Sequence, residues 1–240
     1  MSKCIIVPVF NEYENINILL NEIYKNDFKD LIIIIVDDSD KNFENNIKKQ
    51  NDKIIYLFRG KKLGRGSAVL YGIKYALSAF DNIDLFIEMD ADMSHNPNEL
   101  KKNLSFFSEN KLDLLISSRY KKNSKIINWP LKRKILSFLS NRLSKLVLKV
   151  PITDYTNGYR IYSNQAAKFV MQNCGKIGDG YIVLSEILIQ LYYNKYKIDE
   201  IDTIFVNRVK GTSNVTISEI LLSLIGLFKI WKEKKKIIDS

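Results

Sequence analysis

The sequence predicts an α/β fold in which a mostly parallel sheet is flanked by helices. Its apolar runs, such as residues 4–9 and 31–36, are short and nearly continuous, which is typical of strands buried on both faces of a parallel sheet. Segments with apolar residues at helical spacing lie between these runs, and such alternation indicates βαβ units. Polar clusters follow several runs, at the strand ends where parallel sheets bind ligands. The sequence therefore predicts a ligand crevice at the carboxyl edge of the sheet.

The expected elements follow one another along the chain. We expect strands at residues 4–9, 31–36, 54–58, 85–89, 112–116 and 198–206, and a short strand after a turn at 154–160. We expect helices after residue 11, after the glycines at 64 and 66, and at 97–107, 131–150, 181–193 and 217–236. Asn11 and Asn96 are expected to cap the helices that follow them, and Pro97 and Glu99 suit the first turn of the second helix. The lysine-rich segment 120–128 lacks apolar periodicity and is expected to be a mobile loop.

Composition indicates a globular protein of a reducing compartment. A chain of 240 residues with 46% hydrophobic residues can bury a sizeable core in one large α/β domain. Its two cysteines, Cys4 and Cys174, offer no disulfide framework and no metal-ligand spacing, which fits the cytosol. The chain opens without a signal-peptide pattern, and no apolar run is long enough to cross a bilayer. We therefore expect a cytoplasmic protein.

The net charge of +10 is concentrated in one segment. Residues 114–153 include ten basic residues and no acidic one, so the charge of this segment equals the net charge of the whole chain. Nucleic acid, an acidic membrane face or a phosphorylated substrate would suit such charge, and a solvated basic face is the alternative. No recognisable nucleic-acid-binding module accompanies it, whereas apolar residues recur at helical spacing within 131–150. We therefore expect no nucleic acid partner, and a basic amphipathic helix that lies on an anionic membrane surface.

A second helix of this kind is expected near the C-terminus. Residues 217–236 are strongly apolar between 220 and 231 and end in Lys-Glu-Lys-Lys-Lys. The apolar part is too short to span a bilayer, so the helix lies in the membrane interface, docks on a partner or packs on the sheet. The simplest division is one domain over residues 1–214 and an amphipathic membrane-interface helix over residues 215–240.

Two carboxylates, Asp90 and Asp92, form the centre of the expected site. They follow the strand at 85–89 with a spacing of two, and in an extended segment such residues project to the same side. Two hard oxygen ligands suit Mg²⁺ or Mn²⁺, with phosphate oxygens and waters completing the coordination. An acidic surface turn is the alternative. His95 is the only histidine, and we expect it to orient the turn and not to bind a metal directly.

Two further motifs at strand ends allow more than one interpretation. Gly64-Arg65-Gly66-Ser67 lacks the Gly-Lys-Ser/Thr ending of a phosphate-binding P-loop, so glycines that open a helix at a tight turn are the favoured interpretation. Asp37 and Asp38 follow a strand. They either accept hydrogen bonds from a ribose or base, or form an Asx turn, and the sequence favours neither.

Together these motifs resemble glycosyltransferase family 2, which has the GT-A fold, and within it the polyprenol-phosphate (dolichol-phosphate) mannose synthases. The resemblance extends over almost the whole chain. Its motifs lie, in order, at residues 7–12, 36–39, 63–68, 89–97, 117–120, 154–160 and 208–213. The chain departs from the family pattern at Asn214, where a lysine is common, and in segment 37–40, which is compressed.

The resemblance implies a role for each group of site residues. It implies nucleotide-sugar binding by Pro8, Phe10, Glu12, Val36, Asp37, Asp38, Asp90 and Ala91. It implies metal binding by Asp90 and Asp92, with an oxygen or a water-mediated contact from Ser94. It implies binding of the acceptor phosphate by Arg119, Arg133, Ser137 and Arg208. Among these, Asp92, Arg119 and Arg133 are the expected catalytic residues.

The activity implied is the inverting transfer of a hexose, mannose from GDP-mannose, to a polyprenyl or dolichyl phosphate. The oxygen of such an acceptor is already anionic, so arginines need only position it and no general base is required. The alternative is transfer from a UDP-sugar to a glycan hydroxyl, which needs a carboxylate base such as Asp179 or Glu186. A hydroxyl acceptor would not explain the basic segment at residues 114–153. A further alternative is a binding subunit without activity, but such a subunit would not explain the intact pair Asp90 and Asp92. We expect a peripheral protein on the cytoplasmic face of a membrane, held there by interfacial binding or by a small membrane subunit.

Overall fold

A seven-stranded sheet forms the centre of the protein in the computed structural model, which describes residues 1–48, 53–207 and 217–239. The strands are β1 (Lys3–Val9), β2 (Leu31–Asp37), β3 (Ile54–Phe58), β4 (Leu85–Glu88), β5 (Leu114–Ser118), β7 (Arg160–Ser163) and β8 (Ile198–Asp202). Their order in the sheet is β3-β2-β1-β4-β7-β5-β8. Only β7 runs antiparallel to its neighbours in this sheet, so the mostly parallel sheet predicted from the sequence is confirmed.

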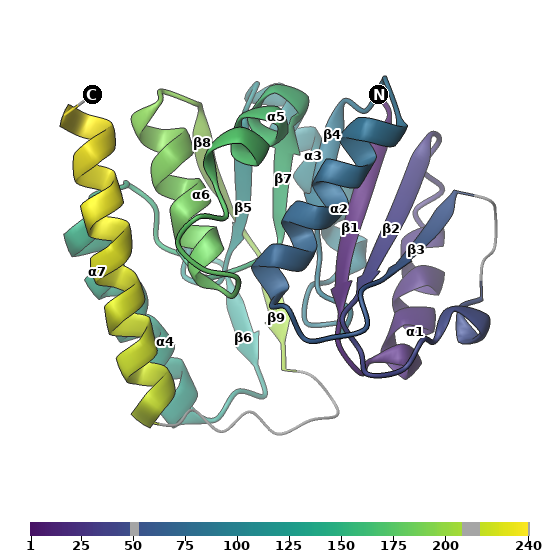
Figure 1. The fold of residues 1–240 in the computed structure, drawn as a ribbon, viewed down its shortest axis with the longest axis horizontal. Coiled ribbons are helices and arrows are strands. Elements are labelled where there is room, and N and C mark those ends of the chain that lie inside the picture. Colours follow the sequence, from purple (N-terminus) through teal and green to yellow (C-terminus); the bar gives the residue numbers. More distant parts are fainter. Residues whose placement is uncertain (49–52, 208–216, 240) are drawn as a thin grey trace.

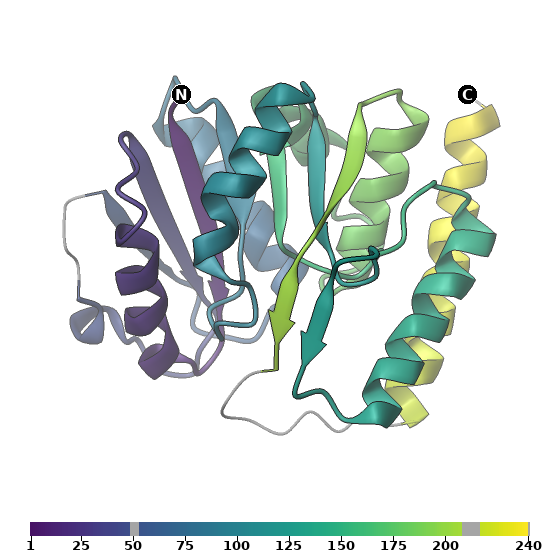
Figure 2. The ribbon, with the colours of Figure 1, turned by 180° about the vertical axis from the view of Figure 1, so that it is seen from behind.

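Helices cover both faces of the sheet. One face carries α2 (Arg65–Ala79), α5 (Asn164–Asn173) and α6 (Ile182–Tyr193), and the other carries α1 (Tyr13–Tyr24) and α3 (Leu100–Glu109) (Figures 1 and 2). Successive residues of a strand point to opposite faces. In β1, Ile6 accordingly packs in the core beneath α2, whereas Ile5 packs in the core beneath α1. The continuous apolar strands thus have the two-sided burial that their composition indicated.

Two long helices stand side by side at one end of the sheet. They are α4 (Leu131–Leu148) and α7 (Ile217–Asp239), and they lie beyond β8 in both views (Figures 1 and 2). The Nζ of Lys234 donates a hydrogen bond to the carbonyl oxygen of Val147 at 3.0 Å, which joins α7 to α4. Gly226 packs against Ile182, so α7 also rests on α6. Beside them, below β5 in Figure 1, β6 (Lys125–Ile127) and β9 (Ile204–Val206) form a small parallel ribbon.

Several local expectations were wrong. Segment 120–128 is not a loop throughout, because β6 forms within it by pairing with β9, some eighty residues away and invisible to local periodicity. Asn11 does not cap α1, since it has a left-handed backbone (φ 56°) and its N–H donates to Ser39 Oγ at 2.7 Å. The expected strand 198–206 divides into β8 and β9, and α5 has no counterpart among the expected elements.

Short 3-10 turns complete the chain. One spans Glu44–Asn46 and the other Pro97–Glu99, directly before α3. The Asn96 side chain accepts a hydrogen bond from the N–H of Asn98, so this residue caps the turn as predicted. Glu99 instead accepts from the hydroxyl of Thr203 and the N–H of Ile204, which ties the start of α3 to β9.

Candidate active site

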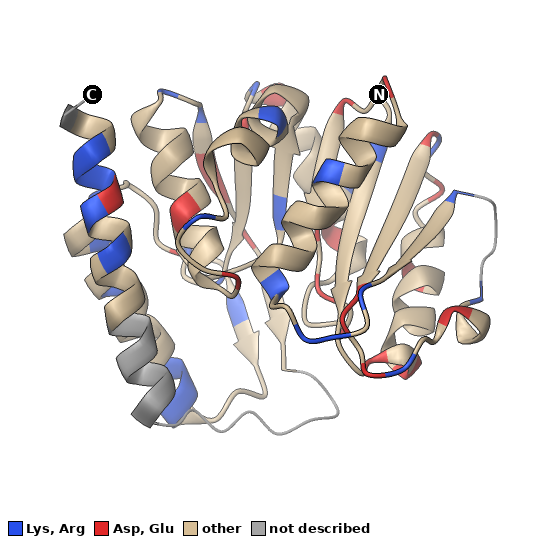
Figure 3. Cartoon of the chain, viewed as in Figure 1, with Lys and Arg blue, Asp and Glu red and all other residues tan. Residues whose placement is uncertain are grey.

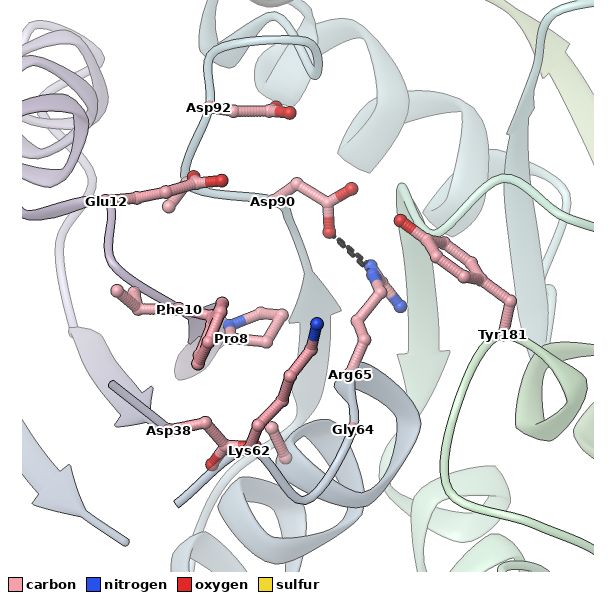
Figure 4. Close-up of a pocket in the computed structure, with 13 residues that line it drawn as sticks. Pro8, Phe10, Glu12, Asp38, Lys62, Gly64, Arg65, Asp90, Asp92 and Tyr181 are labelled. Carbon is pink, nitrogen blue, oxygen red and sulfur yellow. Dashed lines mark hydrogen bonds and ion pairs between the residues drawn. The ribbon is translucent and has the colours of Figure 1, made fainter. Parts of the chain in front are cut away.

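The parallel strands β1, β2 and β4 end at the same edge of the sheet, and a cavity lies there (Figure 4). Its volume is about 280 Å³. Its walls come from the segment after β1, the turn after β2, the loop before α2, the turn after β4 and the segment before α6. The lining residues are Pro8, Val9, Phe10, Glu12, Asp38, Lys62, Gly64, Arg65, Ala68, Asp90, Ala91, Asp92 and Tyr181. The ends of β1, β2 and β4, which the sequence predicts to form one ligand crevice, therefore line one cavity.

Asp90 is held by an arginine at the wall of the cavity. Its Oδ1 accepts from Arg65 Nε at 2.7 Å (Figure 4), and the same guanidinium also bonds Glu88. Burial acts to raise the pKa of Asp90, but the positive charge of Arg65 more than offsets it, so the pKa lies below its ordinary value. Asp90 is therefore ionised at neutral pH and can serve as a ligand for a cation.

His95 holds the turn that carries both aspartates. The backbone N–H of Asp90 donates to its Nδ1 at 2.9 Å, so Nε2 carries the proton and donates to Asn157 Oδ1 at 2.9 Å. The ring is buried and stacks on Tyr159, with 5.2 Å between ring centroids. The structure thus gives His95 the orienting position expected for it, between the acidic turn and the segment after Asp154.

The acidic turn fits a divalent cation that arrives with a phosphate group. Asp92 accepts from the N–H of Ser94 at 3.0 Å, and the hydroxyl of Ser94 is buried with no hydrogen-bond partner. Asp90, Asp92 and Ser94 together offer the hard oxygen atoms that Mg²⁺ and Mn²⁺ prefer. Among the described residues, no group of three or more His, Cys, Asp or Glu side chains is placed to hold an ion. Outside ligands, such as phosphate oxygens and waters, would have to complete the coordination.

The two aspartates after β2 differ in position. Asp37 is fully buried and accepts from the N–H of Ser39 at 2.8 Å, which is the Asx-turn interpretation. Asp38 lines the cavity and is held by Arg59, with Nε to Oδ1 at 2.5 Å and Nη2 to Oδ2 at 2.7 Å. Val36 lies in the sheet core beside them. Of this trio, Asp38 is therefore the residue that lines the cavity.

Three cavity residues with polar side chains were not among the predicted site residues. They are Lys62, whose Nζ lies 4.8 Å from the ring centroid of Phe10, Arg65, and Tyr181, whose ring lies 5.6 Å from the Arg65 guanidinium. The signal for the first two was the basic run around Gly64, which the sequence assigned to a turn. Gly64 has φ 99°, and a Cβ there would lie 2.6 Å from the carbonyl oxygen of Asp179. Glycine therefore lets the segment that ends in Tyr181 close against the cavity.

A second group of predicted residues lies around Arg119. Its guanidinium is buried and forms a two-bond ion pair with Asp154, with both N to O distances at 2.7 Å. Burial acts to raise the pKa of Asp154, but Arg119 more than offsets it, so this pKa is lowered. The rings of Tyr120, Trp129 and Phe205 surround the guanidinium at 5.4 to 5.6 Å. Arg119 is thus committed to an internal pair, which its predicted role as a phosphate ligand did not foresee.

The remaining predicted acceptor residues lie next to this group. Arg133 stacks on Trp129 at 4.2 Å and donates to Asn207 Oδ1 at 3.1 Å. Ser137, one turn further along α4, accepts from the hydroxyl of Tyr120 at 2.6 Å. Arg208 lies outside the described residues. The charge of Arg119 also acts to lower the pKa of Asp90, after the larger effect of Arg65.

Helix α4 presents its apolar side to solvent. Its buried side consists of Asn141, Ser144 and Leu148, and Asn141 accepts from the N–H of Tyr155 at 2.7 Å. The exposed apolar side chains are Leu131, Ile135, Phe138, Leu139, Leu143 and Leu146. Basic residues lie along α4 and α7 (Figure 3). A helix of a globular domain normally buries its apolar stripe, so the outward apolar side of α4 is an unusual exposed hydrophobic surface. No helix within residues 1–48, 53–207 and 217–239 has both the length and the apolarity that a bilayer crossing requires.

Comparisons with known proteins agree with this architecture. The chain is 28% identical over 221 residues to a polyprenol monophosphomannose synthase of Mycolicibacterium smegmatis, covering 90% of this chain and 82% of that protein. It is 26% identical over 215 residues to an undecaprenyl-phosphate mannosyltransferase of Micrococcus luteus, covering 88% and 86%.

Solved structures show the same fold. Glucosyl-3-phosphoglycerate synthase from Mycobacterium tuberculosis, in complex with Mn²⁺, UDP-glucose and phosphoglyceric acid, superposes with a TM-score of 0.68 at 14% identity, covering 96% of this chain and 80% of that one. The same enzyme with Mg²⁺ and UDP gives a TM-score of 0.63 at 13% identity, covering 94% and 79%. The model of the family described as glycosyl transferase family 2 matches residues 4–170. The chain therefore belongs to glycosyl transferase family 2, as its motifs indicated.

Proposed function

We propose that the protein transfers mannose from GDP-mannose to a polyprenyl phosphate with inversion at the anomeric carbon. The observation that carries the choice of acceptor is the solvent-facing apolar side of α4, with basic residues beside it and Arg133 and Ser137 on its first turns. A lipid phosphate combines an apolar chain with an anionic head, which is the pair of properties that this face complements. The names of the two mannosyl-transferring relatives support the same choice.

The donor would lie in the cavity at the strand ends. Pro8, Phe10 and Asp38 would contact its nucleoside, and Asp90 and Asp92, with Ser94, would hold Mg²⁺ or Mn²⁺. When bound, this cation neutralises charge on the departing diphosphate. Lys62, which lines the same cavity, would add a positive charge toward the diphosphate. This placement of the donor is supported by the residues that line the cavity. Glucosyl-3-phosphoglycerate synthase, which has the same fold, was solved with Mn²⁺ and UDP-glucose bound.

The acceptor needs positioning and not deprotonation. A phosphate monoester oxygen is anionic near neutral pH, so Arg133 and Ser137 need only direct it toward the anomeric carbon. A glycan hydroxyl would need a base, and Glu186 is poorly placed for that task. It is almost fully buried, and its carboxylate accepts from the N–H groups of Gly175 at 2.9 Å and Lys176 at 3.2 Å. The tethering of Glu186 thus counts against Glu186 as the base that a hydroxyl acceptor would need.

The membrane contact would be made by α4 together with α7. Ile225 and Phe228 of α7 are exposed while Ile230 is buried, so α7 has an outer apolar side of its own. We propose that both helices lie in the interface of an anionic membrane, on its cytoplasmic face, and that residues 215–240 serve as part of this anchor. The alternative is that a small membrane subunit covers the same side of the helices. Vesicles made only of lipid distinguish direct membrane binding from binding through a subunit, because direct binding requires no protein partner.

Donor and acceptor are tested together by a partition assay. The protein is incubated with Mn²⁺, a short-chain polyprenyl phosphate and either labelled GDP-mannose or labelled UDP-glucose. The proposal expects label in the organic phase with GDP-mannose. Label in that phase only with UDP-glucose would replace the donor, and label only on added oligosaccharide would replace the acceptor and contradict the proposal.

Substituting Arg133 by alanine is expected to raise the KM for the lipid phosphate about tenfold, with little change in the KM for the donor. A charge-assisted hydrogen bond to phosphate contributes about 1.5–3 kcal/mol, which corresponds to at least a tenfold effect. Initial rates at varied acceptor concentration measure it. Lys134→Ala removes a charge from the neighbouring position and is the matched control, with an unchanged acceptor KM. An unaltered acceptor KM in Arg133→Ala would remove this residue from the phosphate site.

Placing charge on the outer side of α4 is expected to detach the protein from membranes. Leu139→Glu and Leu146→Glu, at side chains that are 56% and 75% exposed, should lower binding to anionic vesicles without unfolding the protein. Activity should fall on vesicle-borne polyprenyl phosphate and persist on a detergent-solubilised acceptor. Vesicle flotation and parallel rate measurements check this. Unchanged flotation in both variants would show that α4 is not the contact.

A further inference from the structure

Arg65 places a positive charge against one of the two aspartates of the acidic turn. Its Nε donates to Asp90 Oδ1 at 2.7 Å, and its Nη2 lies 2.6 Å from the same oxygen atom. Its Nη1 bonds Glu88, so the guanidinium bridges two carboxylates at the end of β4. A cation that approaches Asp90 alone therefore finds this oxygen already occupied by a cationic side chain.

The surroundings of the Arg65 guanidinium are shaped to hold it. Gly158 lies against it so closely that a Cβ at this position would overlap the guanidinium. Its Nη2 also approaches the carbonyl oxygen of Gly158 at 3.4 Å, and the Tyr181 ring lies 5.6 Å away. A guanidinium in this position is therefore a built feature of the cavity wall and not a loosely placed surface side chain.

The two carboxylates hold Arg65 in different ways. Glu88 is 1% exposed and is fixed from its other side by the hydroxyl of Tyr162 at 2.7 Å. Asp90 lines the cavity and its side chain is 20% exposed. Glu88 can thus anchor one edge of the guanidinium while the edge that faces Asp90 exchanges its partner. A diphosphate is a suitable replacement, because phosphate oxygens accept paired hydrogen bonds from arginine as carboxylates do.

We propose that Arg65 keeps a bare divalent cation off Asp90 and transfers its hydrogen bonds to the diphosphate when the nucleotide binds. This inference rests on the proposed nucleotide-sugar donor. The cation then gains Asp90 only together with the nucleotide, so that the two ligands bind cooperatively. Linkage requires this cooperativity to be reciprocal, since the nucleotide tightens cation binding by the same factor as the cation tightens nucleotide binding. Arg65 is in this account a donor-binding residue that also sets the order of loading.

Binding measurements without any acceptor test this role. Mn²⁺ affinity is measured by electron paramagnetic resonance, without nucleotide and with GDP or UDP, and nucleotide affinity by calorimetry at saturating Mn²⁺. Arg65→Gln should bind bare Mn²⁺ about tenfold more tightly than the wild type, because Asp90 is released, and should bind nucleotide about tenfold more weakly. Gly158→Ala displaces the guanidinium without removing it and should tighten the binding of bare Mn²⁺ in the same direction.

Lys62→Gln is the matched control. Lys62 brings the same charge to the same cavity, but its Nζ lies over the Phe10 ring and forms no ion pair with a carboxylate in the described part of the chain. This variant should weaken nucleotide binding and leave the affinity for bare Mn²⁺ within about twofold, because only a screened charge is lost. An equal gain in Lys62→Gln and Arg65→Gln would reduce the effect to net charge and overturn the proposal.

The remaining outcomes separate this inference from the proposed function. If the wild type binds GDP or UDP with Mn²⁺ but Arg65→Gln and Gly158→Ala bind bare Mn²⁺ as the wild type does, the role of Arg65 is wrong and the donor proposal stands. If the wild type binds neither nucleotide in the presence of Mn²⁺, the donor proposal fails, and the role of Arg65 fails with it. Circular dichroism on each variant confirms that the fold is kept before affinities are compared.

Discussion

Replacing Asp92 with alanine is expected to lower the rate of sugar transfer by about a thousandfold or more and to leave the fold intact. Loss of a carboxylate that holds the cation removes charge stabilisation from the departing diphosphate, and losses of this size are typical of such groups. Asp92 is partly exposed, and the hydrogen bond that it accepts comes from Ser94 in the same turn, so its removal leaves no opposite charge buried and unpaired. Initial rates and urea unfolding measure the two quantities separately.

Asp202→Ala is the matched control for this variant. Asp202 pairs with Lys102 at 2.8 Å on the surface, at the end of β8 and outside the cavity. Its loss should leave the transfer rate nearly unchanged, because Asp202 does not line the cavity. The free energy of unfolding should also change little, because exposed ion pairs contribute about 1 kcal/mol or less to stability. If Asp92→Ala retained more than about a tenth of the wild-type rate, the acidic turn would not be the cation site.

Replacing Arg119 with methionine is expected to destabilise the protein by about 3–5 kcal/mol, because it leaves the carboxylate of Asp154 buried without its partner. Asp154 has no exposed surface, and Arg119 supplies two side-chain hydrogen bonds to it in addition to its own backbone N–H at 2.9 Å. Urea denaturation measures the free energy of unfolding. The double variant Arg119→Met/Asp154→Leu removes both charges and should recover much of the loss. A loss below about 1 kcal/mol in the single variant would mean that the pair is not buried in solution.

The same pair predicts a pH dependence of stability. In the folded protein, the ion pair with Arg119 lowers the pKa of Asp154 below the reference value of 3.8. The carboxylate of Asp154 therefore binds a proton more weakly in the folded state than in the unfolded state. The contribution is therefore fully present above 3.8 and is lost as the pH falls through the lowered pKa. The difference in unfolding free energy between the wild type and Asp154→Asn should be constant near neutral pH and shrink below that value. A difference that instead shrank toward alkaline pH would contradict the assigned charge state.

Local pattern was enough to predict the sheet and the acidic turn. Strands such as β1 and β2 are buried on both faces, and their unbroken apolar runs report that burial directly. The position of Asp90 and Asp92 followed because residues after parallel strands collect at one edge. By contrast, β6 depends on pairing with β9, and a partner so far along the chain leaves no periodic signal within residues 125–127.

The parts of the site that the sequence missed depend on contacts between distant segments. Tyr181 reaches the cavity because Gly64 lets the segment before α6 approach α2, which no motif around Tyr181 indicates. Arg65 appeared to belong to a turn, and its bond with Asp90 became visible only when helix α2 and strand β4 were placed together. The sequence shows the apolar spacing of α4, but which side of the helix faces outward depends on the inward packing of Asn141 and Ser144.

The requirement for an anionic lipid acceptor is tested most directly by comparing two acceptors that differ by a single group. Vesicles that carry a polyprenyl phosphate and vesicles that carry the corresponding free polyprenol are given the same labelled GDP-mannose, Mn²⁺ and protein. The account predicts label on the phosphate alone, because its oxygen attacks without a base and Arg133 has a charge to bind. Equal labelling of the free alcohol, or labelling of neither lipid while an added oligosaccharide is mannosylated, would contradict it.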